Sequence, residues 1–166
     1  MSPDLHIYLG GHPVDIYLRP VSGSERLTAQ ALADEIFGTP SPITHTAEGA
    51  PEISSRPTVE ISVSHSGGIL AMAIAPRGTG IGIDIERTDR TKQLRRIITR
   101  FLTPAEAKAY TDNLTEAWTL KAALYKSHRG ALSPSLTDYA IPPACPWYTT
   151  AIPMQALHLS ITMIQP

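Results

Sequence analysis

Cysteine is nearly absent from this sequence, since Cys145 is the only one in 166 residues. A single cysteine excludes an internal disulfide and any zinc site built from several cysteines. Long hydrophobic runs are also missing, because none approaches the roughly 18 residues that a membrane span needs. The first nine residues carry no basic segment followed by an apolar one, which is the pattern of a secretory signal. We therefore expect a cytoplasmic protein without a membrane-spanning segment.

Lysine is scarce as well, with four lysines among 14 basic residues. The 15 acidic residues bring the formal net charge to −1, so the charge of the whole chain gives no reason to expect a nucleic-acid partner. Hydrophobic residues make up 42% and charged residues 17% of the chain, a composition that folds around a core. The length suits one compact unit.

Fifteen prolines and eleven glycines divide the chain into short elements. Apolar residues that alternate with polar ones predict strands, and apolar residues three or four positions apart predict helices. The predicted strands cover residues 5–9, 14–18, 59–64, 69–75, 81–86 and 156–164, and the predicted helices cover residues 24–37, 88–100 and 114–127, with another helix starting at Thr103. The three central strands are expected to form an antiparallel meander, and residues 39–57 an irregular segment. The fold class predicted is mixed α+β.

Two of the helices carry clear start signals. Ser24 is a candidate N-cap of the first helix, and Gly38 is a candidate stop signal. Its expected apolar stripe consists of Leu27, Ala31, Ala33 and Ile36. Thr103 followed by Pro104, with Glu106 at the third helical position, predicts a capping box at the later helix.

One strand carries two carboxylates on the same face. In residues 80–86 the isoleucines occupy one face, while Gly82, Asp84 and Glu86 occupy the other. The Cα atoms of Asp84 and Glu86 are expected about 6.6 Å apart, so both side chains can converge on one ion. Two carboxylates with substrate phosphates and water are a typical set of magnesium ligands. A solvated strand face with ordinary acidic residues is the alternative, and spacing alone does not decide between them.

Further motifs surround this strand in a characteristic order. Before it stands Ser62-Val63-Ser64-His65-Ser66-Gly67, after it Trp118-Thr119-Leu120-Lys121-Ala122-Ala123-Leu124-Tyr125-Lys126, and then Gly130-Ala131-Leu132-Ser133. Together these segments resemble the 4′-phosphopantetheinyl transferase superfamily, specifically its surfactin-synthetase-activating type. The resemblance extends from about residue 38 to residue 139, and its specificity lies in the ordered combination of motifs.

The resemblance implies a fold and an activity. The expected fold consists of two related α+β halves about a pseudo-twofold axis, with a shortened N-terminal half at residues 1–76 and a C-terminal half at residues 77–166. The expected activity is magnesium-dependent transfer of phosphopantetheine from coenzyme A to a serine of an acyl or peptidyl carrier protein. Because one chain would contain both halves, we expect the protein to act as a monomer.

The resemblance also implies roles for individual residues. Asp84 and Glu86 would hold Mg²⁺ against the pyrophosphate of coenzyme A. Ser64 and His65, at the strand end, would lie at the cofactor, with His65 at its 3′-phosphate. Lys126 would bind a phosphate and protonate the leaving group. Without the resemblance, His65 is interpreted equally well as a strand-end histidine bonded to a turn. For Lys126, a solvated helix lysine is the more common interpretation.

Two positions depart from the family pattern. Ala122 stands where the family has the glutamate that completes the metal site and is a candidate base. Glu116 does not replace it, because six residues at 100° each place it on another face of the helix. Ala50, in Gly49-Ala50-Pro51, stands where the family has a lysine that contacts coenzyme A. Both departures remove charge from the same expected cleft.

Positive charge gathers in residues 87–100, which hold six basic residues and one acidic residue, a local net charge of +5. This segment is either a solvated helix face or a docking surface for an acidic carrier protein. Nucleic acid is disfavoured because no aromatic residues are interleaved. Three hypotheses follow for the whole chain: an active transferase, a non-catalytic protein that binds coenzyme A or a carrier protein, and an unrelated α+β domain.

Overall fold

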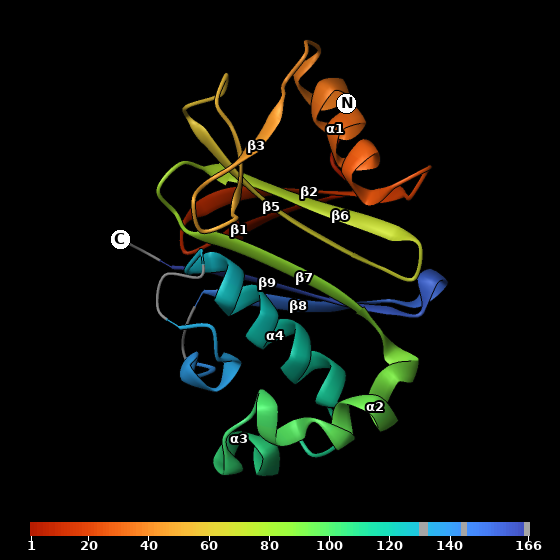
Figure 1. The fold of residues 1–166 in the computed structure, drawn as a ribbon, viewed down its shortest axis with the longest axis vertical. Helices are drawn as coiled ribbons and strands as arrows, with labels where there is room; N and C mark the ends of the chain where they lie inside the picture. Colours follow the sequence, from red (N-terminus) through yellow and green to blue (C-terminus); the bar gives the residue numbers. More distant parts are fainter. Residues whose placement is uncertain (130–132, 144–145, 165–166) are drawn as a thin grey trace.

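In the computed structural model, which describes residues 1–129, 133–143 and 146–164, two antiparallel sheets are stacked between helical layers (Figure 1). The first sheet has the order β1-β2-β6-β5, and its strands are β1 (Leu5–Leu9), β2 (His12–Pro20), β6 (Ile69–Pro76) and β5 (Val59–Ser66). The second has the order β7-β9-β8, and its strands are β7 (Ile81–Arg87), β9 (Leu157–Met163) and β8 (Trp147–Ile152).

Helices cover the outer faces of the two sheets (Figure 1). The helices are α1 (Glu25–Phe37) on the first sheet, α4 (Leu114–Ser127) on the second, and α2 (Thr91–Arg96) and α3 (Pro104–Ala109) near the start of α4. The mixed α+β class is therefore confirmed. None of the helices in the described ranges is both long and apolar enough to cross a membrane. The expected segment 130–132 and Cys145 lie outside the described residues.

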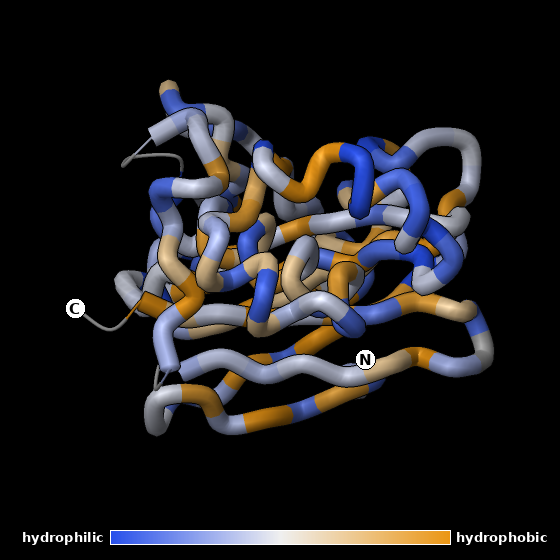
Figure 2. The backbone as a smooth tube through the Cα atoms, turned by 90° about the horizontal axis from the view of Figure 1, so that it is seen from below, coloured by the Kyte–Doolittle hydropathy of each residue, from blue (hydrophilic) through white to orange (hydrophobic). Residues whose placement is uncertain are grey.

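The main core lies between the two sheets. Ile81, Ile83 and Ile85 point from β7 into this core, as the alternation predicted. They pack against the first sheet, where the fully buried side chains that β6 contributes to this core are the small ones of Ala71, Ala73 and Ala75. Figure 2 shows hydrophobic and hydrophilic stretches alternating along the backbone, the pattern of elements with one buried and one polar face.

The predicted meander of three strands is wrong. Strands β5 and β6 pair as expected, but β7 crosses to the second sheet and pairs with β9. Side chains of β5 nevertheless bind the backbone of β7: the amide of Ile83 donates to Ser62 Oγ at 3.1 Å, and the amide of Ile85 donates to Ser64 Oγ at 3.3 Å. These hydroxyl groups satisfy edge amides of β7, so the two sheets adjoin without backbone pairing.

The apolar stripe predicted for the first helix is confirmed for Ala33 and Ile36 and wrong for Leu27 and Ala31, which are exposed. The N-cap is confirmed by the hydrogen bond from the Leu27 amide to Ser24. Leu27 is 59% exposed. The buried apolar side chains are Ala29, Leu32 and Ala33, which pack on the first sheet. Their three- and four-residue spacing defines a helix face more regularly than the predicted set does.

Two other segments differ from their predictions. Residues 39–57 contain a short hairpin of β3 (Ile43–His45) and β4 (Pro51–Ile53). The predicted helix over residues 88–100 is divided into a 3₁₀ turn, α2 and a second 3₁₀ turn, with Ile97 outside helical geometry. Leu94 and Phe101 are nevertheless both fully buried, in one cluster with Leu114 and Ala117 of α4.

The substitution Gly82→Ala is expected to destabilise the protein, because Gly82 is where the α4 backbone reaches β7. A Cβ atom at this position would lie 2.0 Å from the carbonyl oxygen of Ala123 and 2.6 Å from the amide nitrogen of Ser127. Backbone atoms cannot move aside independently, so we expect a loss of about 1–3 kcal/mol in the free energy of unfolding. Urea denaturation measures this loss, and an unchanged midpoint would contradict the close contact.

Candidate functional site

Three of the residues predicted from separate motifs meet at one carboxylate. Asp84 Oδ1 accepts hydrogen bonds from Lys126 Nζ and from Ser64 Oγ, each at 2.8 Å. The Asp84 side chain is only 10% exposed. Burial raises the pKa of the Asp84 carboxyl, against the opposing effects of the Lys126 ammonium and the Ser64 hydroxyl.

Lys126 links α4 to this carboxylate. It lies in the last turn of α4, and its ammonium also donates to the carbonyl of Ile83 at 3.0 Å. Its side chain is 30% exposed, unlike that of Asp84, and it lines the large cavity described below. The ammonium can therefore face both the carboxylate and a ligand in the cavity.

The second predicted carboxylate, Glu86, is held by a different set of groups. Its Oε1 accepts from Ser66 Oγ at 2.7 Å and from the amide of Arg87 at 2.8 Å. Its Oε2 lies 2.5 Å from Arg90 Nη1. The alternating serines of β5 thus orient both carboxylates of β7, and Arg90 neutralises the charge of Glu86. Arg90 stands four positions after Glu86, but Glu86 lies in β7 and Arg90 in the 3₁₀ turn that follows, so helical spacing is not the reason that they meet.

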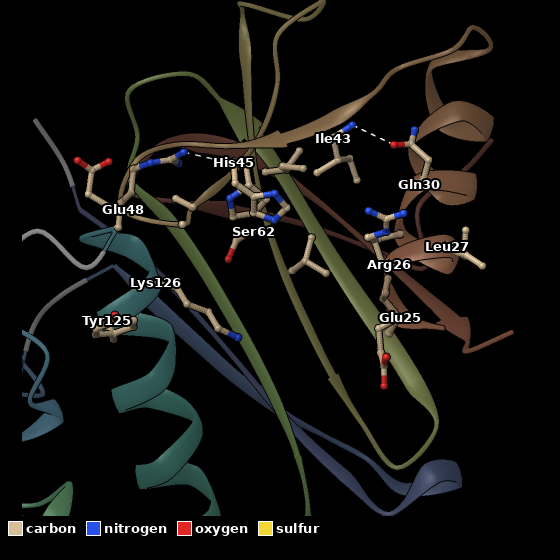
Figure 3. Close-up of a pocket in the computed structure, with 18 residues that line it drawn as sticks. Glu25, Arg26, Leu27, Gln30, Ile43, His45, Glu48, Ser62, Tyr125 and Lys126 are labelled. Carbon is tan, nitrogen blue, oxygen red and sulfur yellow. Dashed lines mark hydrogen bonds between the residues drawn. The ribbon is translucent and has the colours of Figure 1, made fainter. Parts of the chain in front are cut away.

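A cavity of about 790 Å³ opens beside Lys126, between α1, the β3–β4 hairpin, β5 and the end of α4 (Figure 3). Its basic side chains come from separate elements and are Arg26, His45, Lys126 and Arg129, and its acidic ones are Glu25 and Glu48. Figure 3 shows Glu25 and Arg26 extending from α1 and Lys126 from α4. The volume is in the range of small-molecule sites, and the basic groups suit an anionic ligand.

Sequence reasoning missed three of these four basic residues. Arg26 and His45 carry no motif, and the cavity brings them together only through the tertiary fold. Arg129 stands three positions after Lys126, so helical spacing was the one available signal.

The other predicted cofactor residues are placed differently. Ser64 is buried, and its Oγ donates to Asp84 and accepts from the amide of Ile85. His65 is not among the described residues that line the cavity. Its side chain is 56% exposed, and Nδ1 lies 3.5 Å from Glu25 Oε1, a group that does line the cavity. His65 therefore adjoins the cavity near the start of α1.

This geometry can be compared with known families. Residues 80–152 match the family model of the 4′-phosphopantetheinyl transferase superfamily. The matched stretch includes Asp84, Glu86 and Lys126, and it indicates phosphopantetheine transfer as the general chemistry. No curated protein matches the chain.

Phosphopantetheinyl transferases typically use magnesium. The residues present could supply part of the ligand set of such a site. Asp84 and Glu86 supply oxygen donors from adjacent positions on one strand face. The described residues contain no group of three or more His, Cys, Asp or Glu that could hold a metal ion. Ala122 occupies the helix position one turn before Lys126. Phosphate and water oxygens would have to complete such a site.

The Lys121 side chain of the matched helix lies outside the cavity, in the protein interior. It is 0% exposed, and its Nζ lies 2.7 Å from Glu106 Oε1 and donates to the carbonyl of Tyr139 at 2.6 Å. Glu106 is also the third residue of the confirmed capping box of α3. This lysine therefore ties α4 to α3 and to the segment around Tyr139.

The basic segment 87–100 lies on the surface around α2. All six of its basic side chains are exposed: Arg87, Arg90, Lys92, Arg95, Arg96 and Arg100. Two of them are paired with carboxylates, Arg87 with Asp89 and Arg90 with Glu86. Buried Leu94 and Phe101 fix the segment against α4. Most of the positive charge remains turned towards solvent.

Proposed function

We propose that this protein transfers the 4′-phosphopantetheine group from coenzyme A to a serine of an acyl or peptidyl carrier protein. The observation that carries the proposal is the contact of Asp84, Ser64 and Lys126 beside a cavity with several basic side chains. These residues come from three separate motifs of the family that the sequence resembles. The match of residues 80–152 to the superfamily supports the same chemistry.

In the proposed reaction the serine oxygen of the carrier protein attacks the phosphorus that bears the pantetheine. The phosphoanhydride bond of coenzyme A breaks, and adenosine 3′,5′-bisphosphate leaves. Lys126 binds a phosphate and donates a proton to the leaving group, while the serine proton passes to water or to a phosphate oxygen. His65 binds the 3′-phosphate from the edge of the cavity.

Asp84 and Glu86 are the residues proposed to hold Mg²⁺, with Ser64 and Ser66 orienting them. The ion would supply charge neutralisation as the phosphoanhydride breaks. The proposed partner surface is the basic segment 87–100, which suits an acidic carrier protein. The two sheets fall within residues 1–76 and 77–166, so we also propose these as the two related halves of a monomer.

Intact-mass spectrometry of an apo carrier protein, incubated with coenzyme A and magnesium, tests this function. We expect one phosphopantetheine group to be added, and Asp84→Asn to reduce the initial rate by on the order of 10²-fold or more. Asp112→Asn makes the same chemical change at an exposed position outside the cavity and is expected to leave the rate unchanged. Equal rates for both variants would contradict the role of Asp84.

A second candidate function rests on Ala122. Without a third carboxylate among the described residues around Asp84, the same scaffold can bind coenzyme A or a carrier protein without transfer. Saturable binding of coenzyme A, together with no product on carrier proteins that a known transferase modifies, would favour this candidate.

A further inference from the structure

The cavity has an uncharged residue, Ala50, where the resemblance implies a positive charge, and it has a positive charge nearby at Arg129. Ala50 lines the cavity, where the family that the sequence resembles has a lysine. Arg129 lines the same cavity and stands just beyond the end of α4. The two positions are 79 residues apart in sequence, so their proximity arises from the fold.

The guanidinium of Arg129 lies directly beside position 50. Its Nη2 donates to the carbonyl oxygen of Pro51, the residue after Ala50, at 3.3 Å. In the described part of the chain no ion pair joins Arg129 to a carboxylate. One hydrogen bond to a carbonyl leaves further guanidinium donors and the full charge available to an anion.

The backbone of Arg129 supports a functional reading. Its φ is 53°, in the left-handed region that glycine adopts without penalty and that other residues rarely occupy. Arg129 and Ala156 are the two non-glycine residues with positive φ in the described ranges. A glycine here would end the helix with less strain. An arginine in this conformation, with its side chain lining a cavity, is therefore a candidate for a binding role.

We propose that Arg129 binds a phosphate group of coenzyme A and so supplies the positive charge that Ala50 lacks. The inference rests on the proposed function, because coenzyme A is the ligand that function requires. In this proposal the cation comes from just beyond the end of α4, where the resemblance implies one in the loop between β3 and β4. Arginine suits this role because its planar donors bind two phosphate oxygens at once.

Isothermal titration of the full chain with coenzyme A tests the proposal. Arg129→Gly is expected to weaken binding at least tenfold while the melting temperature stays the same or rises, because glycine accepts this φ. Arg129→Lys keeps the charge and is expected to lose less affinity. Lys108→Ala removes a positive charge at an exposed position outside both the cavity and the segment 87–100, and it is expected to leave binding unchanged.

The double variant Ala50→Lys/Arg129→Gly is the decisive test. Returning a lysine to position 50 is expected to restore the affinity for coenzyme A to within about threefold of the natural protein. Unchanged binding by Arg129→Gly, or no recovery in the double variant, would overturn this inference and leave the proposed function standing. Absence of coenzyme A binding by the natural protein would overturn both.

Discussion

Replacing Glu106 by alanine is expected to lower the free energy of unfolding by about 3–5 kcal/mol, because it leaves a buried charge without its partner. The Lys121 ammonium is 0% exposed, and Glu106 is its only carboxylate partner among the ion pairs of the described residues. The same glutamate accepts from the backbone and hydroxyl of Thr103 and from the amide of Ile141. Urea denaturation measures the loss.

A double variant separates the charge effect from the loss of packing. Lys121→Met with Glu106→Gln removes both charges and keeps similar volumes, so most of the stability lost in Glu106→Ala is expected to return. Glu106→Gln alone is expected to remain strongly destabilised. If the single and double variants were equally unstable, the ion pair would not be the cause.

The acid sensitivity of the protein follows from the same pair. Burial alone would raise the pKa of Glu106, but the hydrogen bonds from Lys121, Ile141 and Thr103 outweigh it and hold that pKa below the ordinary value. The folded state therefore binds this proton less readily than the unfolded state. Its stabilisation is present above the ordinary glutamate pKa and is lost as pH falls through the lowered one. Glu106→Gln is expected to flatten this part of the stability profile.

Local patterns predicted the parts of the fold that local physics determines. The capping box of Thr103 and Glu106 defines where α3 begins, and Ser24 defines where α1 begins. The two-residue alternation in β7 places Asp84 on the face opposite the isoleucines, and helical spacing gives α4. Each of these features depends on residues a few positions apart.

The features that the sequence did not reveal depend on contacts between distant segments. Nothing within residues 81–86 indicates that β7 pairs with the last strand and that serines of β5 satisfy its free amides. The cavity joins Arg26, His45 and Arg129 from three elements, and none of them stands in a motif. The same limit applies to Lys121, which belongs to a functional motif but lies in the interior.

Introducing the missing carboxylate, Ala122→Glu, is expected to raise the transfer rate by on the order of 10²-fold, the usual contribution of a general base. Position 122 lies one turn before Lys126, whose ammonium contacts Asp84, so a glutamate there would face the same carboxylate. Ala122 is half-buried, so a longer side chain at this position has room on its solvent-facing side. The rate is measured by intact mass of the carrier protein.

Metal binding gives this prediction a second readout, independent of turnover. Three carboxylates in one place repel one another without a cation, so Ala122→Glu is expected to lower the melting temperature in the presence of a chelator. Mn²⁺ would then restore it by more than it raises that of the natural protein, because an ion bound only by the folded state stabilises that state. Ala122→Gln has nearly the same size without the charge and is expected to show neither effect. Equal rates and equal Mn²⁺ responses for the two variants would mean that position 122 does not reach the carboxylate pair, and the base would then have to be water, phosphate or the carrier itself.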